Sequence, residues 1–455
     1  MDLPEVALVN VLSRFPLKII ARFRTVSKEW RSLIDSDFFR DHYISFNSSS
    51  SLSWSIIQTN PHKLSLEIVG HHGCNTWGLH RSPGSFLRFF AKTTIRKLLV
   101  LSCTDGLVSI YAEASDGSPL YYVGNPLLQD WFQLPLPPFL SSQDLDSLRE
   151  NKRFSDTGLV TKMQSGVVVS YKVVWMFTED RSSDKLEFII YSSETGTWRR
   201  QHVSCPHVTV WERQDKSIAF NGMLHWLSED TPSFDASSIV AYDFYGVGSD
   251  DDECRINIIH FPGSEIDEVI GDDGEDDDLR GYRRRFTASE GSIVYFNEFR
   301  ESETWTLRVW RLVKYEDVPE AWQLSWDVKL TSLVESGICC FPVVMHPLNS
   351  DIIYLWNRTD KGLVLFNLRT RVFSCMDGCS LSFNRCSEYM DSIRKYNLLW
   401  YQSPMVSRWS YDECRINIVH FHNMFSLVGC TVSLVLRLLS VYSVWSLNHP
   451  SCLLI

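Results

Sequence analysis

A turn followed six residues later by an aromatic side chain recurs along the middle of this chain. The pattern occurs in NPLLQDW (125–131), SSETGTW (192–198) and NLRTRVF (367–373), where the aromatic residues are Trp131, Trp198 and Phe373. The first two also follow an aromatic-rich run, which is typical of two antiparallel strands joined by a reverse turn. Similar strand ends at Asp243 and Arg311 divide the chain into four steps of about sixty residues. The sequence therefore predicts a fold built from repeated units of antiparallel strands.

Apolar, β-branched and aromatic runs fill the chain from about residue 54 to 403 and predict many strands. They include KLLVLS, LVSIYA, LYYVGN, GVVVSYKVVWMF, LEFIIYS, SIVAYDF, TLRVWRL and GLVLFNL. A glycine stands at the head of several strands, at Gly106, Gly222, Gly291 and Gly362. Radial repetition of such units protects the sheet edges, so we expect a β-propeller of about six blades. A two-sheet sandwich is the alternative.

The first forty residues show helical rather than strand-like spacing. Pro4 suits the first turn of a helix, and Leu8, Val11, Leu12 and Phe15 follow at i, i+3, i+4 and i+7 before Pro16 discourages continuation. A second pattern places Leu17, Ile20 and Phe23 on one side. A third sets Val26, Trp30, Leu33 and Ile34 at helical spacing, with Ser27 as its N-cap. Three short helices are expected.

This small module carries more apolar surface than three short helices can cover among themselves. Val6 and Val9 add apolar surface off the main stripe of the first helix. Units of roughly forty residues are marginal without a metal, disulfides or a partner. A partner protein would cover the excess; packing on the following domain would also do so. The basic residues Arg14, Lys18 and Arg22 recur at i+4 and are interpreted as a solvated face.

The segment LPEVALVNVLSRFPLKIIARFRTVSKEWRSLI (3–34) resembles an F-box. Its Leu-Pro start, the Arg14-Phe15-Pro16 step and Trp30 match that pattern, with Phe15 and Ile19 as mild departures. The resemblance implies a three-helix module that docks on the SKP-type adaptor of a cullin-based ubiquitin ligase. By position it implies adaptor-binding roles for Leu3, Pro4, Leu8, Val11, Leu12, Phe15, Pro16, Ile20, Val26, Trp30 and Leu33.

The body of the chain resembles the F-box-associated propeller-like domain of plant F-box proteins. The stretches responsible include YYVGNPLLQDWFQLPLPP, YKVV, YSSETGTWRR, FNGMLHWLS, LRVWRL and VVMHPLNSDIIYLW. The resemblance implies a non-catalytic receptor subunit of an SCF ubiquitin ligase whose β domain binds a target protein through residues that the sequence leaves unknown. A binding scaffold outside any ligase and a propeller hydrolase are the alternatives. The expected division is an F-box at 1–45, a linker at 46–53, the β domain at 54–403 and an atypical tail at 404–455.

Charge and cysteine content exclude several other classes. The net charge of −11 argues against nucleic-acid binding, which needs a basic surface. Twelve cysteines without a regular framework or a secretory leader are typical of reduced thiols in the cytoplasm or nucleus. The possible metal ligands His71, His72 and Cys74, and likewise Cys375, Cys379 and Cys386, lack paired knuckle spacing. No metal or cofactor is expected, and His225 is interpreted as a satisfied strand histidine.

Three features near the end of the β domain and in the tail stand apart from the repeat. Residues 249–279 are rich in Asp and Glu and predict a solvated acidic insertion. DECRINIIHF (252–261) returns as DECRINIVHF (412–421), with nine identities in ten at an offset that is not a whole number of repeat steps. This indicates a recent duplication or an artefact of exon assignment. The apolar stretch 425–447 is interpreted as a poorly folded extension, with a membrane anchor or added core strands as alternatives.

Overall fold

The structure is a computed structural model of the 455-residue chain. It describes residues 5–15, 17–36, 38–39, 42–43, 46, 54–60, 65–69, 94–125, 130–140, 157–164, 167–177, 185–204, 210–211, 217–230, 235–246, 256–262, 284–301, 304–316, 318–330, 340–346, 349–357, 362–375 and 393–397. The tail beyond residue 397 and the stretch 425–447 therefore lie outside the described residues. Among those that are described, no helix has the length and apolar character needed to cross a membrane.

The three short helices that the sequence predicts are present in the N-terminal module, and the described residues 38–39, 42–43 and 46 beyond them are also helical. The three helices are α1 (Glu5–Leu12), α2 (Leu17–Phe23) and α3 (Lys28–Ile34). The hydroxyl of Ser27 accepts a hydrogen bond from the backbone N–H of Trp30 at 3.2 Å, which confirms Ser27 as the N-cap of α3. The first helix ends earlier than its apolar stripe, because the N–H groups of Arg14 and Phe15 bond three residues back rather than four.

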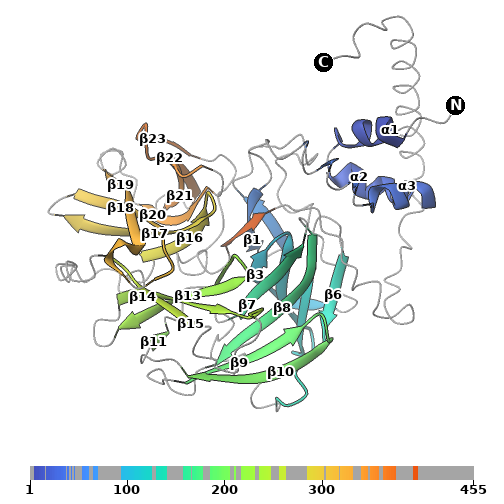
Figure 1. Ribbon diagram of the computed structural model, residues 1–455, viewed down its shortest axis with the longest axis horizontal. Helices are drawn as coiled ribbons and strands as arrows, with labels where there is room; N and C mark the ends of the chain where they lie inside the picture. The colour runs from blue at the N-terminus through green and yellow to red at the C-terminus, as the bar shows by residue number, and fades with distance from the viewer. Residues whose placement is uncertain are drawn as a thin grey trace, which may run out of the picture. The chain divides into compact units, whose positions relative to one another are not determined.

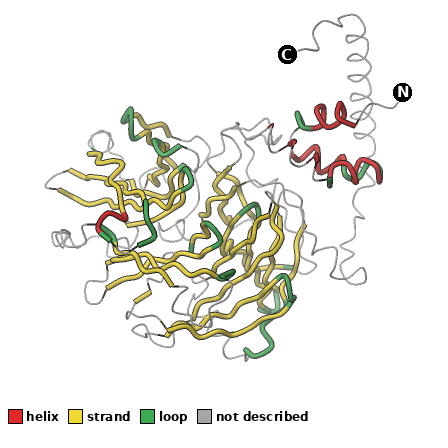
Figure 2. The backbone as a smooth tube through the Cα atoms, in the orientation of Figure 1, coloured by secondary structure: helices red, strands yellow, loops and turns green. Residues whose placement is uncertain are grey.

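Most of the described chain after residue 54 is strand, as Figure 2 shows. The first full sheet contains β3 (Ile95–Thr104), β4 (Leu107–Ala114), β5 (Pro119–Asn125) and β6 (Asp130–Leu134). The second contains β7 (Thr157–Gln164), β8 (Val167–Phe177), β9 (Lys185–Ser192) and β10 (Thr197–Ser204). The third contains β11 (Val210–Trp211), β12 (Ile218–Phe220), β13 (Met223–Asp230), β14 (Asp235–Asp243) and β15 (Ile256–His260).

Two further full sheets and one smaller sheet complete the β region (Figure 1). The fourth sheet contains β16 (Arg284–Ser289), β17 (Ser292–Glu301), β18 (Thr304–Leu312) and β19 (Trp322–Lys329), with the short 3-10 helix η4 (Pro319–Ala321) before β19. The fifth contains β20 (Cys340–Met345), β21 (Ile352–Asn357), β22 (Gly362–Asn367) and β23 (Val372–Cys375). The smaller sheet has the order β2 (Ser65–Val69), β1 (Trp54–Asn60), β24 (Ile393–Asn397).

The connectivity is that of a β-propeller. Each full sheet is an antiparallel meander formed from one continuous stretch of chain, and the first strands of consecutive sheets contact one another. The antiparallel pairing of β1 with β24 then joins the two ends of the β region in a single sheet. The predicted number of six blades is approximate, because there are five sheets of four or five strands and one of three.

The core lies between neighbouring sheets rather than within one of them. Four clusters of buried apolar side chains each combine residues from two consecutive full sheets. Aromatic contacts at three of these junctions join Tyr121 to Trp175 (4.7 Å between ring centroids), Phe188 to Tyr242 (5.2 Å) and Phe261 to Tyr295 (3.7 Å). Aromatic pairs have preferred ring geometries and stabilise the fold beyond the burial of their apolar area, so they help to fix each blade against the next.

The recurrent turns predicted from the sequence join the third and fourth strands of a sheet. Asn125, Ser192 and Asn367 end β5, β9 and β22, and each aromatic residue six positions later lies in the next strand. Asp243 and Arg311 also lie at or near the end of a third strand. The first copy of the repeated decapeptide supplies β15, so the range 249–279 includes a strand of the third sheet as well as acidic runs.

Candidate functional site

The helical module is held together by aromatic rings and two polar contacts. Phe23 makes edge-on contacts with Phe15 (5.6 Å between ring centroids) and with Trp30 (5.1 Å). The hydroxyl of Tyr43 donates to the backbone oxygen of Phe15 at 3.2 Å, and the guanidinium of Arg24 lies 2.7 Å from the carboxylate of Asp35. These contacts connect the end of α1, both ends of α3 and the segment beyond it. The apolar residues at the surface are therefore presented on a defined scaffold.

The residues predicted to bind an adaptor fall into three groups in this module. Leu3, Pro4 and Pro16 lie outside the described residues. Leu12, Ile20 and Leu33 are buried and belong to the interior. The accessible members are the partly buried Leu8, Val11, Phe15 and Trp30, and Val26, which is 43% exposed.

Two further exposed apolar side chains belong to the same module. Val6 is 57% exposed and Phe38 is 49% exposed. Neither is among the predicted contact residues. Helical spacing places Val6 on a different side of α1 from the stripe formed by Leu8, Val11 and Leu12. Contiguous apolar patches on a soluble protein mark protein-binding surfaces, and these accessible side chains are the candidates for such a patch on this module.

The turns between first and second strands form a closely connected end of the propeller. Asp105 and Gly106, Asn221 and Gly222, and Glu290 and Gly291 have positive φ in consecutive pairs, as two-residue hairpin turns require. The carboxylate of Asp105 accepts a hydrogen bond from the hydroxyl of Thr161 in the next sheet. This end of the first two blades is therefore tied by a polar contact as well as by the apolar core.

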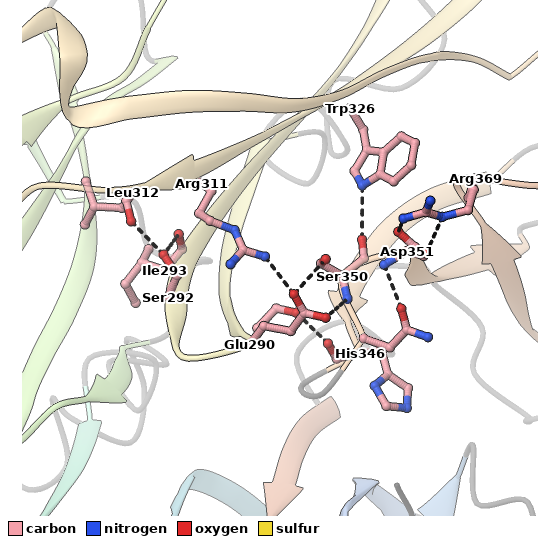
Figure 3. A network of polar contacts seen from close by, with 12 residues as sticks. Glu290, Ser292, Ile293, Arg311, Leu312, Trp326, His346, Ser350, Asp351 and Arg369 are labelled. Carbon is pink, nitrogen blue, oxygen red and sulfur yellow. Dashed lines mark hydrogen bonds and ion pairs between the residues drawn. The ribbon is translucent and has the colours of Figure 1, made fainter.

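The corresponding junction of the fourth and fifth sheets carries a larger polar network (Figure 3). The carboxylate of Glu290 accepts hydrogen bonds from the backbone N–H and the hydroxyl of Ser350, at 3.0 and 2.9 Å, and one from Arg311 at 3.0 Å. The hydrogen bond from the backbone N–H of Ser350 is the main cause that lowers the pKa of the Glu290 carboxyl, and the hydrogen bond and positive charge of Arg311 lower it further. Next to it, Arg369 pairs with Asp351 at 2.7 Å.

The connections that leave each full sheet begin and end at the opposite edge of the sheets. In an antiparallel meander, the turns between first and second strands and between third and fourth strands share one end, so the connections to the next sheet start at the other. They span residues 135–156, 205–209, 261–283, 330–339 and 376–392. Because surface connections carry recognition on many β scaffolds, this edge is the candidate binding surface for a target.

The groups considered for catalysis or metal binding are not assembled into a site among the described residues. No group of three or more His, Cys, Asp or Glu side chains suited to a metal ion is found there. His71, His72, Cys74, Cys379 and Cys386 lie outside the described residues, as do the acidic runs 249–253 and 265–278. His225 is fully buried, with Nδ1 3.3 Å from the oxygen of Ile218 and Nε2 3.3 Å from the hydroxyl of Tyr315. It is a satisfied strand histidine, as predicted.

Comparison with known proteins matches the chain to two families. Residues 1–42 match the F-box domain family, and residues 52–411 match the family described as F-box protein At3g26010-like, beta-propeller. The Arabidopsis thaliana F-box protein At3g23950 is 55% identical over 428 residues, covering 90% of this chain and 97% of that protein. F-box protein At3g26010 of the same plant is 32% identical over 407 residues, covering 86% of each. The chain belongs to the family of F-box proteins with an At3g26010-like β-propeller.

Proposed function

We propose that this protein is the target-binding subunit of an SCF-type ubiquitin ligase. The helical module would bind a SKP-type adaptor and through it a cullin, and the propeller would bind the protein to be ubiquitinated. The observation that carries the proposal is the set of accessible apolar side chains on a module that matches the F-box family. F-box domains generally bind adaptors of this type, and that generality supports the assignment.

Such a subunit needs no catalytic group of its own. By holding a target beside a ubiquitin-charged enzyme, it makes ubiquitin transfer effectively intramolecular, which raises the effective concentration of the target lysines. The chemistry would be supplied by other subunits. This protein would determine which target is brought to them and in which orientation.

The adaptor contact can be tested on one face of α1 with a matched control on the same helix. Leu8 and Val11 are partly buried apolar residues, whereas Asn10 between them is exposed. We expect Leu8→Asp combined with Val11→Asp to abolish co-purification of the adaptor, because a carboxylate at an apolar interface is costly to desolvate. Asn10→Asp adds one carboxylate to the exposed side of the same helix and should leave binding unchanged, and Leu8→Asp alone provides the comparison at equal charge. Circular dichroism verifies that each variant keeps its helices.

A second measurement distinguishes a ligase subunit from a scaffold outside any ligase. Affinity purification under proteasome inhibition should recover the adaptor and a cullin with the full chain, and neither with a chain lacking residues 1–45. Proteins retained by both chains are candidate targets of the propeller. Recovery of the adaptor without a cullin would support the scaffold and contradict the ligase assignment.

A further inference from the structure

The last strand of the second sheet, β10, has a longer uninterrupted ladder than the last strands of the other full sheets. Eight consecutive residue pairs join it to β9, from Thr197 to Ser204, without a register shift. The strands β6, β15 and β23 have five, five and four residues, and the ladder of β19 contains a register shift. Short length and bulges are usual means of blunting a sheet edge, so β10 is the least protected of these five outer strands.

One long edge of β10 has no strand beside it among the described residues. In that part of the chain β10 pairs only with β9, and Figure 1 shows it at the outer side of its sheet. The backbone N–H and C=O groups along such an edge can pair with an added strand. An extended segment of another protein can therefore enlarge this sheet.

The two faces of β10 carry different side chains up to this edge. The ring of Trp198 belongs to the core between the first and second sheets, whereas Gln201 donates a 2.8 Å hydrogen bond to the hydroxyl of Tyr242 in the third sheet. Successive side chains on a strand point to opposite faces. Arg200 therefore shares the face of Trp198, and Arg199 shares the face of Gln201.

On the face of Arg200, the surface is apolar and the cation already has a partner. The guanidinium of Arg200 lies 2.7 Å from the carboxylate of Glu187 and 5.2 Å from the ring centroid of Phe139. Phe139 is 38% exposed, and Leu136 in the same connection is 39% exposed. An added strand would therefore bury more of its own surface here with apolar side chains than with charged ones.

On the other face, Arg199 presents an unneutralised cation. Its side chain is exposed, and no described acidic residue forms an ion pair with it. Opposite charges on neighbouring strands stabilise their pairing. The complement of this face is therefore a strand that carries carboxylates at every second position.

The same charges disfavour a second copy of this chain as the occupant of the edge. Two copies paired through β10 would bring Arg199 and Arg200 of both chains onto neighbouring strands. Like charges across a strand pair are destabilising. The edge therefore discriminates against its own copy and in favour of an acidic strand.

We propose that the edge of β10 binds an extended segment of the target protein in which acidic and apolar residues alternate. The segment adds a strand to the second sheet, with its carboxylates on the face of Arg199 and its apolar side chains on the face of Phe139. The backbone ladder supplies affinity, and the alternation supplies selectivity. This inference names the target chemistry of the proposed receptor, and it rests on the proposed function.

A fluorescent decapeptide of alternating glutamate and valine tests the contact with the full chain. We expect saturable binding in fluorescence anisotropy that weakens as salt is added, because the charges at this edge are exposed. A peptide of the same composition with all its glutamates in one block should bind about tenfold more weakly. Absence of saturable binding by the alternating peptide, or equal binding by both peptides, would overturn the proposal.

Methylation of the peptide backbone distinguishes strand addition from binding through side chains alone. In an extended strand, the N–H groups of alternate residues point to opposite edges. One alternating peptide is therefore N-methylated at its glutamates and another at its valines. We expect one of the two to lose binding and the other to retain it, since only one set of N–H groups faces β10. If the two methylated peptides behave alike, no strand is added.

Variants of the full chain assign the contact to β10. Arg199→Glu should weaken binding of the alternating peptide about three- to thirtyfold, because it replaces opposite-charge pairs by like-charge pairs. Lys329→Glu makes the same change of charge at an exposed position of β19 and is its control. Phe139→Ser should also weaken binding, and Leu324→Ser, at a side chain that is 42% exposed, is the matched control. A control that weakens binding as much as its counterpart would place the contact elsewhere.

Recovery of the adaptor separates failure of this inference from failure of the ligase assignment. Arg199→Glu combined with Phe139→Ser changes no residue of the helical module, so affinity purification should still recover the adaptor and a cullin while the targets are lost. Retention of the same targets beside the adaptor would contradict the contact at β10 alone. Loss of the adaptor from the unmodified chain would contradict the ligase assignment and leave the peptide measurement as it is. A dimer in sedimentation that Phe139→Ser dissociates would show a second copy on this edge and overturn the proposal.

Discussion

The indole Nε1 of Trp198 donates a 2.6 Å hydrogen bond to the backbone oxygen of Pro135, across the junction between the first two full sheets. Trp198 lies in the fourth strand of its sheet, and Pro135 directly follows the fourth strand of the preceding one. Trp322 makes the equivalent bond to His260 two junctions later. A buried tryptophan that bonds back to the preceding blade therefore occurs at two junctions of this propeller, and at Trp198 it gives the aromatic residue of the recurrent turn a structural role.

Removing that bond while keeping an aromatic ring should weaken the propeller measurably. Trp198 is 8% exposed, so Trp198→Phe leaves the carbonyl of Pro135 without its donor in a poorly hydrated junction. We expect a loss of about 1–3 kcal/mol in the free energy of unfolding, measured by denaturant titration. Trp322→Phe should cost a similar amount. Val372→Ala, at a side chain that is 62% exposed, is the control and should be close to neutral.

The approach of the second and third sheets leaves no room for a side chain at Gly158. A Cβ there would lie 2.4 Å from Cδ1 of Leu224 and 2.9 Å from the hydroxyl of Ser217. We expect Gly158→Ala to destabilise the protein by about 1–3 kcal/mol, because the fully buried side chain of Leu224 must move within a packed junction. The comparison is Gly222→Ala, where no atom lies within 4 Å but φ is +78°. That variant should lose only about 1 kcal/mol through backbone strain. Equal losses would contradict the steric explanation.

Local patterns of the sequence predicted much of this fold because they depend on local chemistry. The turn before Trp198 and the cap at Ser27 are determined by a few neighbouring residues, and both are confirmed. The pairing of β1 with β24 was not predictable in this way, since its two partners lie at opposite ends of the β region. The first strand of the third sheet is also divided into β11 and β12, which only the register with β13 reveals.

The sequence predicted which module carries the candidate site, but it did not predict which apolar side chains of that module are accessible. Helical spacing places Leu8 and Leu12 on one stripe, but it does not indicate which part of a stripe is used for internal packing. Leu12 is fully buried and Leu8 is partly accessible. Phe38 lies beyond the three periodic segments, so helical spacing did not indicate that it is exposed. Three-dimensional packing, and not periodicity, separates core from surface here.

Acid should destabilise the propeller through His225. Burial lowers the pKa of His225 to about 4, from 6.5 for an exposed imidazole. The unfolded chain then binds more protons between these two values, so stability falls as the pH drops from 6.5 towards 4, by roughly 3 kcal/mol in total from this group. Thermal midpoints at pH 7 and pH 5 provide the measurement. In His225→Gln the midpoint should depend less on pH over this interval, and an unchanged dependence would assign the effect to other groups.

The neighbours Phe38 and Phe39 lie on opposite sides of the boundary between the surface and the interior of the helical module. Phe38 is 49% exposed, whereas Phe39 is fully buried and lies 5.9 Å from Tyr43 between ring centroids. Phe38→Ser should leave the thermal midpoint of the module almost unchanged and weaken adaptor binding, because its ring would be buried only in the complex. Phe39→Ser should cost about 3–5 kcal/mol of stability, and binding would be lost through unfolding. Calorimetric titration with the adaptor, together with circular dichroism of each free variant, measures both effects. Full binding by a folded Phe38→Ser variant would place Phe38 outside the interface.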